Sequence, residues 1–442
     1  MMYKRFLASA ALVLALMSVA GSGVGAFQGA PAIKKPDAAA LNATDEILKS
    51  VSRLRALEVK HMVKAGFKTK DEIEASVIRD LDENTPPEEF NATQKTLLRL
   101  GLVPKEFRLR DFVVKLLREQ VAGYYEPKTK EFYLAAWLPL SEQKKVIAHE
   151  LVHALQDQHF NLRRFERWPK GDSDAELAVH ALVEGEATLI MIQYDFEQQG
   201  MRLDMTKITP LTDRLLEADS NDYDPNYPVL SSAPTVLREN LQFPYIYGAG
   251  FAQAVLKSRS WAGLDKAYDV LPASTEQIMH PERFLARDNP VKIEMPDLAS
   301  AFGRDWKLSD ADVNGEFGFQ VILSEFIAKP AARLAATGWG GDRYSLYENK
   351  ATGATALIEF TTWDSASDAR EFFDAYSERT EKRYKQKRAV VAEGRPRVYE
   401  TAEGLVSIEL RDKDVVIIEG AQDGEQLARI STRAWESKKA MR

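Results

Sequence analysis

The segment from Lys144 to His159 constrains this chain more than any other stretch, because it predicts a helix that carries a metal-binding pattern. The segment has no glycine or proline, and its apolar residues recur at mixed helical spacing. His149 and His153 stand four residues apart in it and therefore lie on one face of the helix. Two imidazoles placed in this way can bind one Zn²⁺ ion at roughly 2.0–2.1 Å.

Glu150 follows the first of these histidines directly, so its carboxylate is offset from the histidine face by one position. From there it can flank a metal ion without binding it and can take a proton from a bound water. The metal would lower the pKa of that water towards about 7, which is the chemistry of metal-assisted hydrolysis. We therefore predict that His149 and His153 are zinc ligands and that Glu150 is the catalytic base.

The next helical pattern, over residues 174–199, is largely apolar and can supply a third ligand. This pattern contains Glu184-Gly185-Glu186-Ala187. A carboxylate on a buried helix face is costly to desolvate, and a metal ion would offset that cost. Glu184 and Glu186 are therefore both candidates for the third ligand, and a solvated acidic helix face is the alternative explanation.

The stretch from His149 to Asp157 resembles the active-site helix of the gluzincins, the thermolysin-like and aminopeptidase-like zinc metallopeptidases. In that group a glutamate on a later helix is the third ligand, and in the aminopeptidase branch this residue opens a Glu-Gly-x-Ala segment. Glu184-Gly185-Glu186-Ala187 matches the segment position by position. The resemblance thus implies that Glu184 binds the metal and that Glu186 is a neighbour.

Other positions limit this resemblance to residues 149–188. Asp157 matches an acidic residue of the thermolysin-like helix, where it either orients a ligating imidazole or is exposed. The separation of His153 from Glu184 is longer than in the two best-known branches, and Thr188 stands where several relatives carry an acidic residue. We expect an exported bacterial gluzincin-like protein that is not a close relative of either branch.

The N-terminus has the order of a secretory signal peptide. Lys4 and Arg5 precede an uncharged apolar run from Phe6 to Ala20, and small residues continue to Ala26. An uncleaved membrane anchor is the alternative, but this run is shorter than the roughly 20 residues that a spanning helix needs. We predict a signal peptide at residues 1–26, export to the periplasm or the medium, and no membrane span after cleavage.

Composition narrows the chemistry and the partners. The chain has no cysteine among its 442 residues, which excludes disulfides, thiolate zinc ligands and a cysteine nucleophile. Its net charge of −7 argues against a nucleic-acid partner, because phosphate neutralisation needs a basic surface. We expect a peptide or protein substrate as the partner, and the sequence does not indicate an oligomeric state.

The remaining patterns predict an α+β fold. A flexible leader at 27–42 precedes helical patterns at 42–64, 71–81, 91–100 and 109–121 and a β-hairpin at 123–134. Beside an active-site helix, the edge strand of such a hairpin either pairs with a peptide backbone or is purely structural. We predict a mainly helical zincin-like metallopeptidase domain with this small hairpin or sheet over residues 43–330.

A small α+β domain is predicted over residues 338–442. It contains strand patterns at 342–348, 356–363, 397–400, 405–410 and 415–419, and helical patterns at 365–384 and 425–438. It has no histidine and no recognisable motif, so no catalytic residue is assigned to it.

Gluzincin-like sites also use a histidine or tyrosine to stabilise the oxyanion of the tetrahedral intermediate. The candidates here are Tyr245, Tyr247 and His280, and His280 ranks first because it lies in a polar segment at a predicted helix end. The resulting prediction is a zinc-dependent peptidase. The alternative is an exported binding or assembly protein that keeps a zincin scaffold, with structural zinc or none. The presence of Glu150 weighs against that alternative, because a structural site has no use for a base there.

Overall fold

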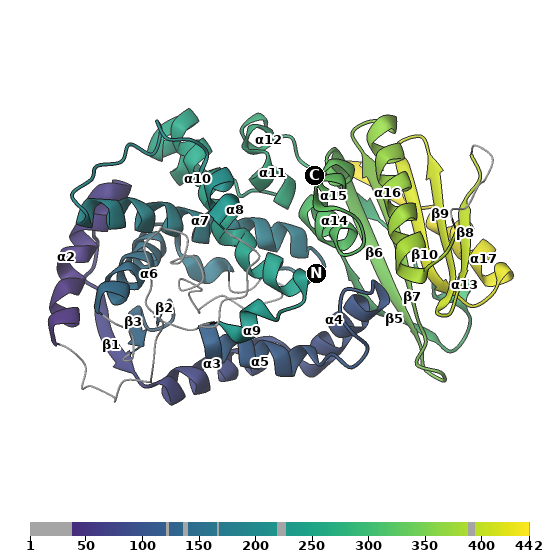
Figure 1. The fold of residues 1–442 in the computed structure, drawn as a ribbon, viewed down its shortest axis with the longest axis horizontal. Coiled ribbons are helices and arrows are strands. Elements are labelled where there is room, and N and C mark those ends of the chain that lie inside the picture. The colour runs from purple at the N-terminus through teal and green to yellow at the C-terminus, as the bar shows by residue number, and fades with distance from the viewer. Residues whose placement is uncertain are drawn as a thin grey trace.

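The computed structural model describes residues 38–120, 123–135, 140–165, 168–218, 227–387 and 394–441. The predicted signal peptide and the first part of the predicted leader, to residue 37, lie outside the described residues, whereas residues 38–42 already belong to helix α2 (Ala38–Arg55). The described chain forms a helical part, which contains a small sheet, followed by a sheet-rich part (Figure 1). The predicted α+β class is therefore confirmed. Among the described helices, none has both the length and the apolar character needed to cross a membrane.

Helix α6 (Leu140–Phe160) lies at the centre of the helical part and confirms the helix predicted at 144–159. Val146, Ile147, Leu151 and Leu155 are all fully buried. Apolar residues occur on every side of α6 because it is covered all round, by α2, by α7 (Ser173–Gln198) and by the small sheet. The motif helix is therefore held by its surroundings on several sides.

The small sheet has the strand order β1-β3-β2, where β1 is Lys64–Lys68, β2 is Gly123–Glu126 and β3 is Glu131–Ala135. Strands β2 and β3 form the antiparallel hairpin predicted at 123–134, and β1 pairs with β3 in parallel. Strand β2 lies at the edge of this sheet and contacts α6. The sheet thus places an edge strand beside the motif helix.

The helix predicted at 42–64 is wrong beyond Arg55, where α2 ends. Ala56 turns the chain with a φ of 59°, and the backbone N–H of Leu57 then bonds back to the carbonyl of Ser52 at 3.2 Å. Leu57 and Val63 are buried in the same core as α2. Their spacing is compatible with a helix, but both residues lie in the loop between α2 and β1.

The other helices of this part are α3 (Lys70–Asn84), α4 (Pro87–Arg99), α5 (Leu109–Gln120), α8 (Leu211–Ala218), α9 (Pro228–Ser231), α10 (Thr235–Ala267), α11 (Thr275–Met279) and α12 (Pro281–Ala286). Helices α3, α4 and α5 confirm the predictions at 71–81, 91–100 and 109–121. Helix α10 is interrupted at Ser260, whose backbone is not helical. It packs along α7 (Figure 1), and near its C-terminal end Asp265 pairs with Arg55 at the end of α2.

The sheet-rich part is built on a six-stranded antiparallel sheet of order β5-β6-β7-β10-β9-β8. Its strands are β5 (Trp306–Asp312), β6 (Trp339–Asn349), β7 (Thr355–Trp363), β8 (Arg397–Thr401), β9 (Gly404–Arg411) and β10 (Asp414–Ala421). Strands β6 to β10 confirm the five predicted strands. The sheet also takes strand β5 from residues before 338, within the segment that the sequence assigned to the first domain.

Both faces of this sheet are covered by helices (Figure 1). Along β10, Val415 and Ile417 pack into the core under α16 (Ala366–Tyr384), whereas Val416 and Ile418 pack into the core under α17 (Gly424–Ala434). Such two-sided burial explains an apolar run without alternation in an antiparallel strand. The helix predicted at 425–438 ends at Ala434.

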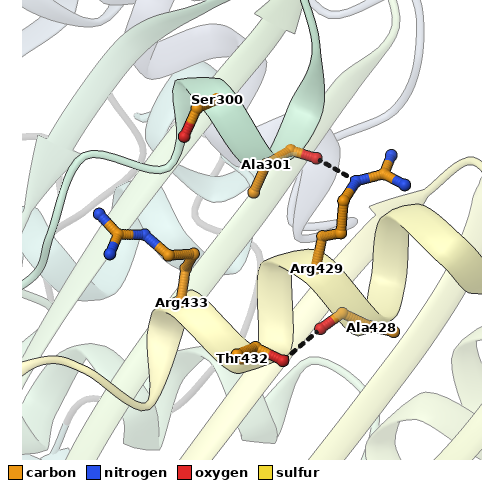
Figure 2. A pocket seen from close by; sticks show the side chains of 6 residues that line it. All are labelled: Ser300, Ala301, Ala428, Arg429, Thr432 and Arg433. Atoms are coloured by element: carbon orange, nitrogen blue, oxygen red, sulfur yellow. Dashed lines mark hydrogen bonds between the residues drawn. The ribbon is translucent and has the colours of Figure 1, made fainter.

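Shorter elements complete the sheet-rich part: β4 (Val291–Glu294), α13 (Ala299–Phe302), α14 (Gly315–Ser324), α15 (Lys329–Ala336) and β11 (Lys438–Met441), which pairs with β4. A pocket of about 450 Å³ lies between α13 and α17 (Figure 2). Its lining residues are Ser300, Ala301, Ala428, Arg429, Thr432 and Arg433. They include no imidazole or carboxylate, so this pocket offers no metal ligands.

Candidate metal centre

Helices α6 and α7 bring His149, His153 and Glu184 together, and we call these residues the His–His–Glu group. The two Nε2 atoms of His149 and His153 are 3.0 Å apart. Oε2 of Glu184 lies 3.0 Å from Nε2 of His149 and 3.3 Å from Nε2 of His153. His149 and His153, from one face of α6, and Glu184, from α7, thus converge on a single point.

The donor atoms lie within a few tenths of an ångström of the spacing found around a bound metal ion. Tetrahedral coordination at roughly 2.0–2.1 Å separates neighbouring ligand atoms by about 3.3–3.4 Å. The three measured separations are 3.0, 3.0 and 3.3 Å. Two imidazole nitrogens and one carboxylate oxygen also form a donor set that suits zinc and leaves a fourth position open. The group can therefore hold a metal ion.

Electrostatics explain why these three side chains can share a buried space. Burial alone would lower the pKa of His153, but Glu184 outweighs burial and raises that pKa to about 9. Burial raises the pKa of Glu184, yet the two imidazoles hold it well below its usual range. Burial lowers the pKa of His149, which therefore stays neutral. Glu184 is thus ionised and needs a positive partner, which is either a proton on His153 or a metal ion.

Glu150 is buried beside the His–His–Glu group, with an exposed fraction of 2%. The backbone N–H of Tyr125 on β2 donates to Oε2 of Glu150 at 2.7 Å. The other oxygen, Oε1, is buried and has no hydrogen-bond partner in the described part of the chain. Burial raises the pKa of Glu150 to about 7, although His153 opposes the shift. One carboxylate oxygen is therefore fixed by the edge strand, and the other remains available as an acceptor.

The side chain that contacts the imidazole of His153 from behind is Gln156 and not Asp157. Oε1 of Gln156 lies 2.8 Å from Nδ1 of His153. Asp157 instead accepts from the hydroxyl of Tyr125 at 3.1 Å and from the backbone N–H of Leu162 at 3.0 Å. Gln156 follows His153 by three positions on the same helix, so helical spacing was the signal that could have identified it.

Glu186 lies away from the His–His–Glu group. It is fully buried, and it accepts from the hydroxyl of Tyr268 at 2.5 Å and from Nε of Arg55. Its two neighbours come from the end of α2 and the end of α10, and no sequence signal linked either of them to the motif. Of the two candidate glutamates, only Glu184 is brought to the histidines.

The three oxyanion candidates occupy different surroundings. The ring of Tyr245 on α10 lies next to His149, with ring centroids 6.1 Å apart. Tyr247 accepts from Arg333 at 3.3 Å and packs on Phe243. His280, ranked first from the sequence, pairs with Glu316 at 2.9 Å. Of the three, Tyr245 is the one whose ring lies beside a described member of the His–His–Glu group.

Four further residues do not belong to the His–His–Glu group. Nε2 of His159 bonds to the carbonyl of Glu58 at 2.8 Å, and His61 is exposed. His180 lies one turn before Glu184 on α7, and burial lowers its pKa. Thr188, one turn after Glu184, is buried.

Comparison with known proteins gives information only about the sheet-rich part. A family model described as a domain of unknown function, DUF8575, matches residues 305–431. This range begins next to β5 and ends within α17, so it covers the six-stranded sheet and not the helices of the His–His–Glu group. No curated protein and no solved structure matches the chain.

Proposed function

We propose that the protein is an exported zinc-dependent peptidase in which His149, His153 and Glu184 hold the metal. The observation that carries the proposal is the buried Oε1 of Glu150, which has no hydrogen-bond partner among the described residues and lies beside three convergent metal donors. An unpartnered buried acceptor costs free energy, and a purely structural metal site would not require it. A general base that awaits a water molecule accounts for it.

The residues of the chain divide the chemistry between them. A zinc ion bound by the His–His–Glu group would supply Lewis-acid polarisation of a carbonyl and acidification of water. Glu150 would accept the proton of the attacking water through Oε1 and pass it to the leaving amine. Tyr245 would donate a hydrogen bond to the developing oxyanion.

The fixed oxygen of Glu150 adds a geometric reason for this assignment. Because Oε2 is held by the backbone of Tyr125, the carboxylate cannot rotate freely, and Oε1 keeps one direction. The same contact places the edge strand β2 beside the base, where an extended peptide could lie. The expected substrate class is therefore a peptide in extended conformation.

The decisive experiment compares zinc content and peptide cleavage in the wild type and in Glu150→Gln. We expect stoichiometric zinc in both proteins and a roughly 10²–10⁴-fold lower kcat in the variant, which is the range for a lost general acid–base. The matched control is Glu282→Gln, which changes an exposed carboxylate on α12 and should leave both values unchanged.

Two results would contradict the proposal. Purified wild-type protein without zinc would contradict the assignment of the metal centre. Unchanged cleavage by Glu150→Gln would contradict the assignment of Glu150 as the base. Stoichiometric zinc without cleavage of a casein or peptide library would instead favour the exported binding protein that keeps a zincin scaffold.

A further inference from the structure

The orientation of the Gln156 side chain is fixed by its neighbours. Its amide nitrogen Nε2 lies 3.0 Å from the carbonyl oxygen of Val183 and 2.9 Å from the hydroxyl of Tyr268. A backbone carbonyl can only accept a hydrogen bond, so the amide nitrogen must lie on that side. The amide oxygen therefore faces His153, and a carbonyl oxygen there can only accept.

This orientation determines where His153 carries its proton. Because Oε1 of Gln156 is an acceptor, Nδ1 of His153 must be the donor across the 2.8 Å contact. In the neutral imidazole the lone pair is then on Nε2. Nε2 is the atom that faces His149 and Glu184. Gln156 thus holds His153 in the tautomer that can bind a metal.

The hydrogen bonds continue from Gln156 to Tyr268 and Glu186 with the same donor-to-acceptor direction. The hydroxyl of Tyr268 accepts from Gln156, so its own hydrogen is free to go to Oε2 of Glu186, 2.5 Å away. The opposite oxygen of Glu186 accepts from Nε of Arg55. Arginine can only donate hydrogen bonds. The hydrogen bonds that start at His153 therefore end at the carboxylate of Glu186, which also accepts from Arg55.

Arg55 closes this chain from the N-terminal helix. Its side chain is fully buried, and its other contacts are Asp265, at 2.6 Å, and the ring of Trp261, at 4.7 Å. Its guanidinium binds one oxygen of Glu186, and the other oxygen of Glu186 accepts from Tyr268. The last residue of α2 is therefore connected to a ligand of the His–His–Glu group through three intermediate side chains.

We propose that Gln156 is a positioning residue that fixes His153 as a metal ligand, and that Arg55, through Glu186 and Tyr268, makes docking of α2 part of metal-site assembly. This inference rests on the proposed metal centre. It gives α2 a role in the site, so that removal of residues 38–55 weakens metal binding. Partners of this kind around a metal ligand typically change metal affinity by about 10–100-fold.

The test measures zinc affinity of the full chain by competition with a chromophoric chelator. Gln156→Leu, which removes the acceptor, should bind zinc about 10–100-fold more weakly. Gln156→Glu keeps an acceptor for the same N–H but loses the donor to the carbonyl of Val183, so it should recover part of that loss. The matched control is Gln158→Leu, on the same helix, because Gln158 contacts Lys60 and His61 and not a member of the group. Gln158→Leu should keep wild-type affinity.

A spectroscopic measurement separates positioning from general loss of structure. In the zinc-loaded wild type the Nδ1 proton of His153 should give a slowly exchanging NMR signal, because Gln156 accepts its hydrogen bond. That signal should be lost in Gln156→Leu and kept in Gln156→Glu. Equal zinc affinity and an unchanged signal in Gln156→Leu would overturn the role of Gln156.

The role of α2 is tested by a double-mutant cycle. Arg55→Met should weaken zinc binding in the wild type and have little further effect in Gln156→Leu, because the connection is already broken. Arg53→Met is the control, since Arg53 is exposed on the same helix and pairs with Glu197 at the surface. Tyr268→Phe removes only a hydroxyl and should also weaken binding if Arg55→Met does not fold.

The outcomes distinguish this inference from the proposed peptidase activity. Additive effects of Arg55→Met and Gln156→Leu would overturn the link to α2. Zinc binding that depends on Gln156 without any peptide cleavage would support the inference and contradict the peptidase. A wild type that binds no zinc would contradict both.

Discussion

Gly185 on α7 and Gly248 on α10 meet backbone to backbone. A Cβ atom on Gly185 would lie 2.0 Å from the carbonyl carbon of Gly248, and one on Gly248 would lie 2.1 Å from the carbonyl oxygen of Ala181. Glu184 directly precedes the first glycine, and Tyr245 precedes the second by three positions on α10. The glycine contact therefore fixes the distance between the helix of the third donor and the helix of the Tyr245 ring.

We expect Gly185→Ala to lower the free energy of unfolding by at least ~2 kcal/mol, because the added methyl group would overlap a backbone that cannot move aside. Zinc affinity should fall as well, since α7 would have to shift with Glu184. Gly424→Ala, where a Cβ has no neighbour within 4 Å, is the control and should change stability little. Urea unfolding and zinc titration measure both effects, and wild-type values for Gly185→Ala would contradict the packing argument.

Zinc should stabilise the protein only when the His–His–Glu group is intact. Free zinc at about 100 times its dissociation constant stabilises a folded protein by about 2.7 kcal/mol, and a chelator should reverse the increase in Tm. Glu184→Gln and His153→Asn should abolish this increase. His159→Asn should keep it, because His159 bonds to the backbone of Glu58. Differential scanning calorimetry with and without zinc gives the result, and an equal increase in Glu184→Gln would exclude Glu184 as a ligand.

Tyr245→Phe should lower kcat by about 10²–10³-fold with little change in KM, because an oxyanion donor acts mainly in the transition state. Tyr247→Phe is the matched control, since its hydroxyl contacts Arg333. His280→Asn should also leave kcat unchanged, because His280 is engaged with Glu316. Steady-state kinetics on a peptide substrate measure these values. A loss of kcat in His280→Asn and not in Tyr245→Phe would restore the order that the sequence suggested.

Glu419 should make the sheet-rich part sensitive to acid. Burial raises the pKa of Glu419, but Arg379 and Arg383 outweigh burial and lower it to about 2. Because this value lies below the ordinary 4.5, the contribution to stability is present above about pH 4.5 and is lost as the pH falls towards 2. The difference corresponds to about 3 kcal/mol.

Glu419→Gln should remove this part of the acid dependence and should destabilise the protein by about 3–5 kcal/mol at pH 7, because the buried Arg379 loses its partner. Glu378→Gln is the control, since Glu378 lies on α16 beside Arg379 but pairs with Lys382 at the surface. Thermal unfolding between pH 2 and pH 7 tests the prediction. An identical pH profile in Glu419→Gln and the wild type would contradict it.

Much of the fold follows from local patterns in the sequence. The absence of glycine and proline around His149 predicts α6, and the aromatic residues on both sides of a polar turn predict the β2–β3 hairpin. The five strands after residue 338 were also predictable, because strand formers such as those of β10 stand between clear turns. The helix at 42–64 was not predicted correctly, because a loop that folds back can bury Leu57 and Val63 as well as a helix can.

The sequence by itself determines the pairing of His149 with His153, since a spacing of four residues places both on one face of any helix. Helical periodicity does not decide between Glu184 and Glu186, and only the resemblance to the gluzincins favoured Glu184. The two glutamates lie about 200° apart around α7, and that helix is buried on both of the sides they face. Only the packing of α6 on one side and of α2 and α10 on the other turns Glu184 to the histidines and Glu186 to Arg55 and Tyr268. Long-range contacts decide this, because the choice depends on which helices lie against α7 and not on the residues within it.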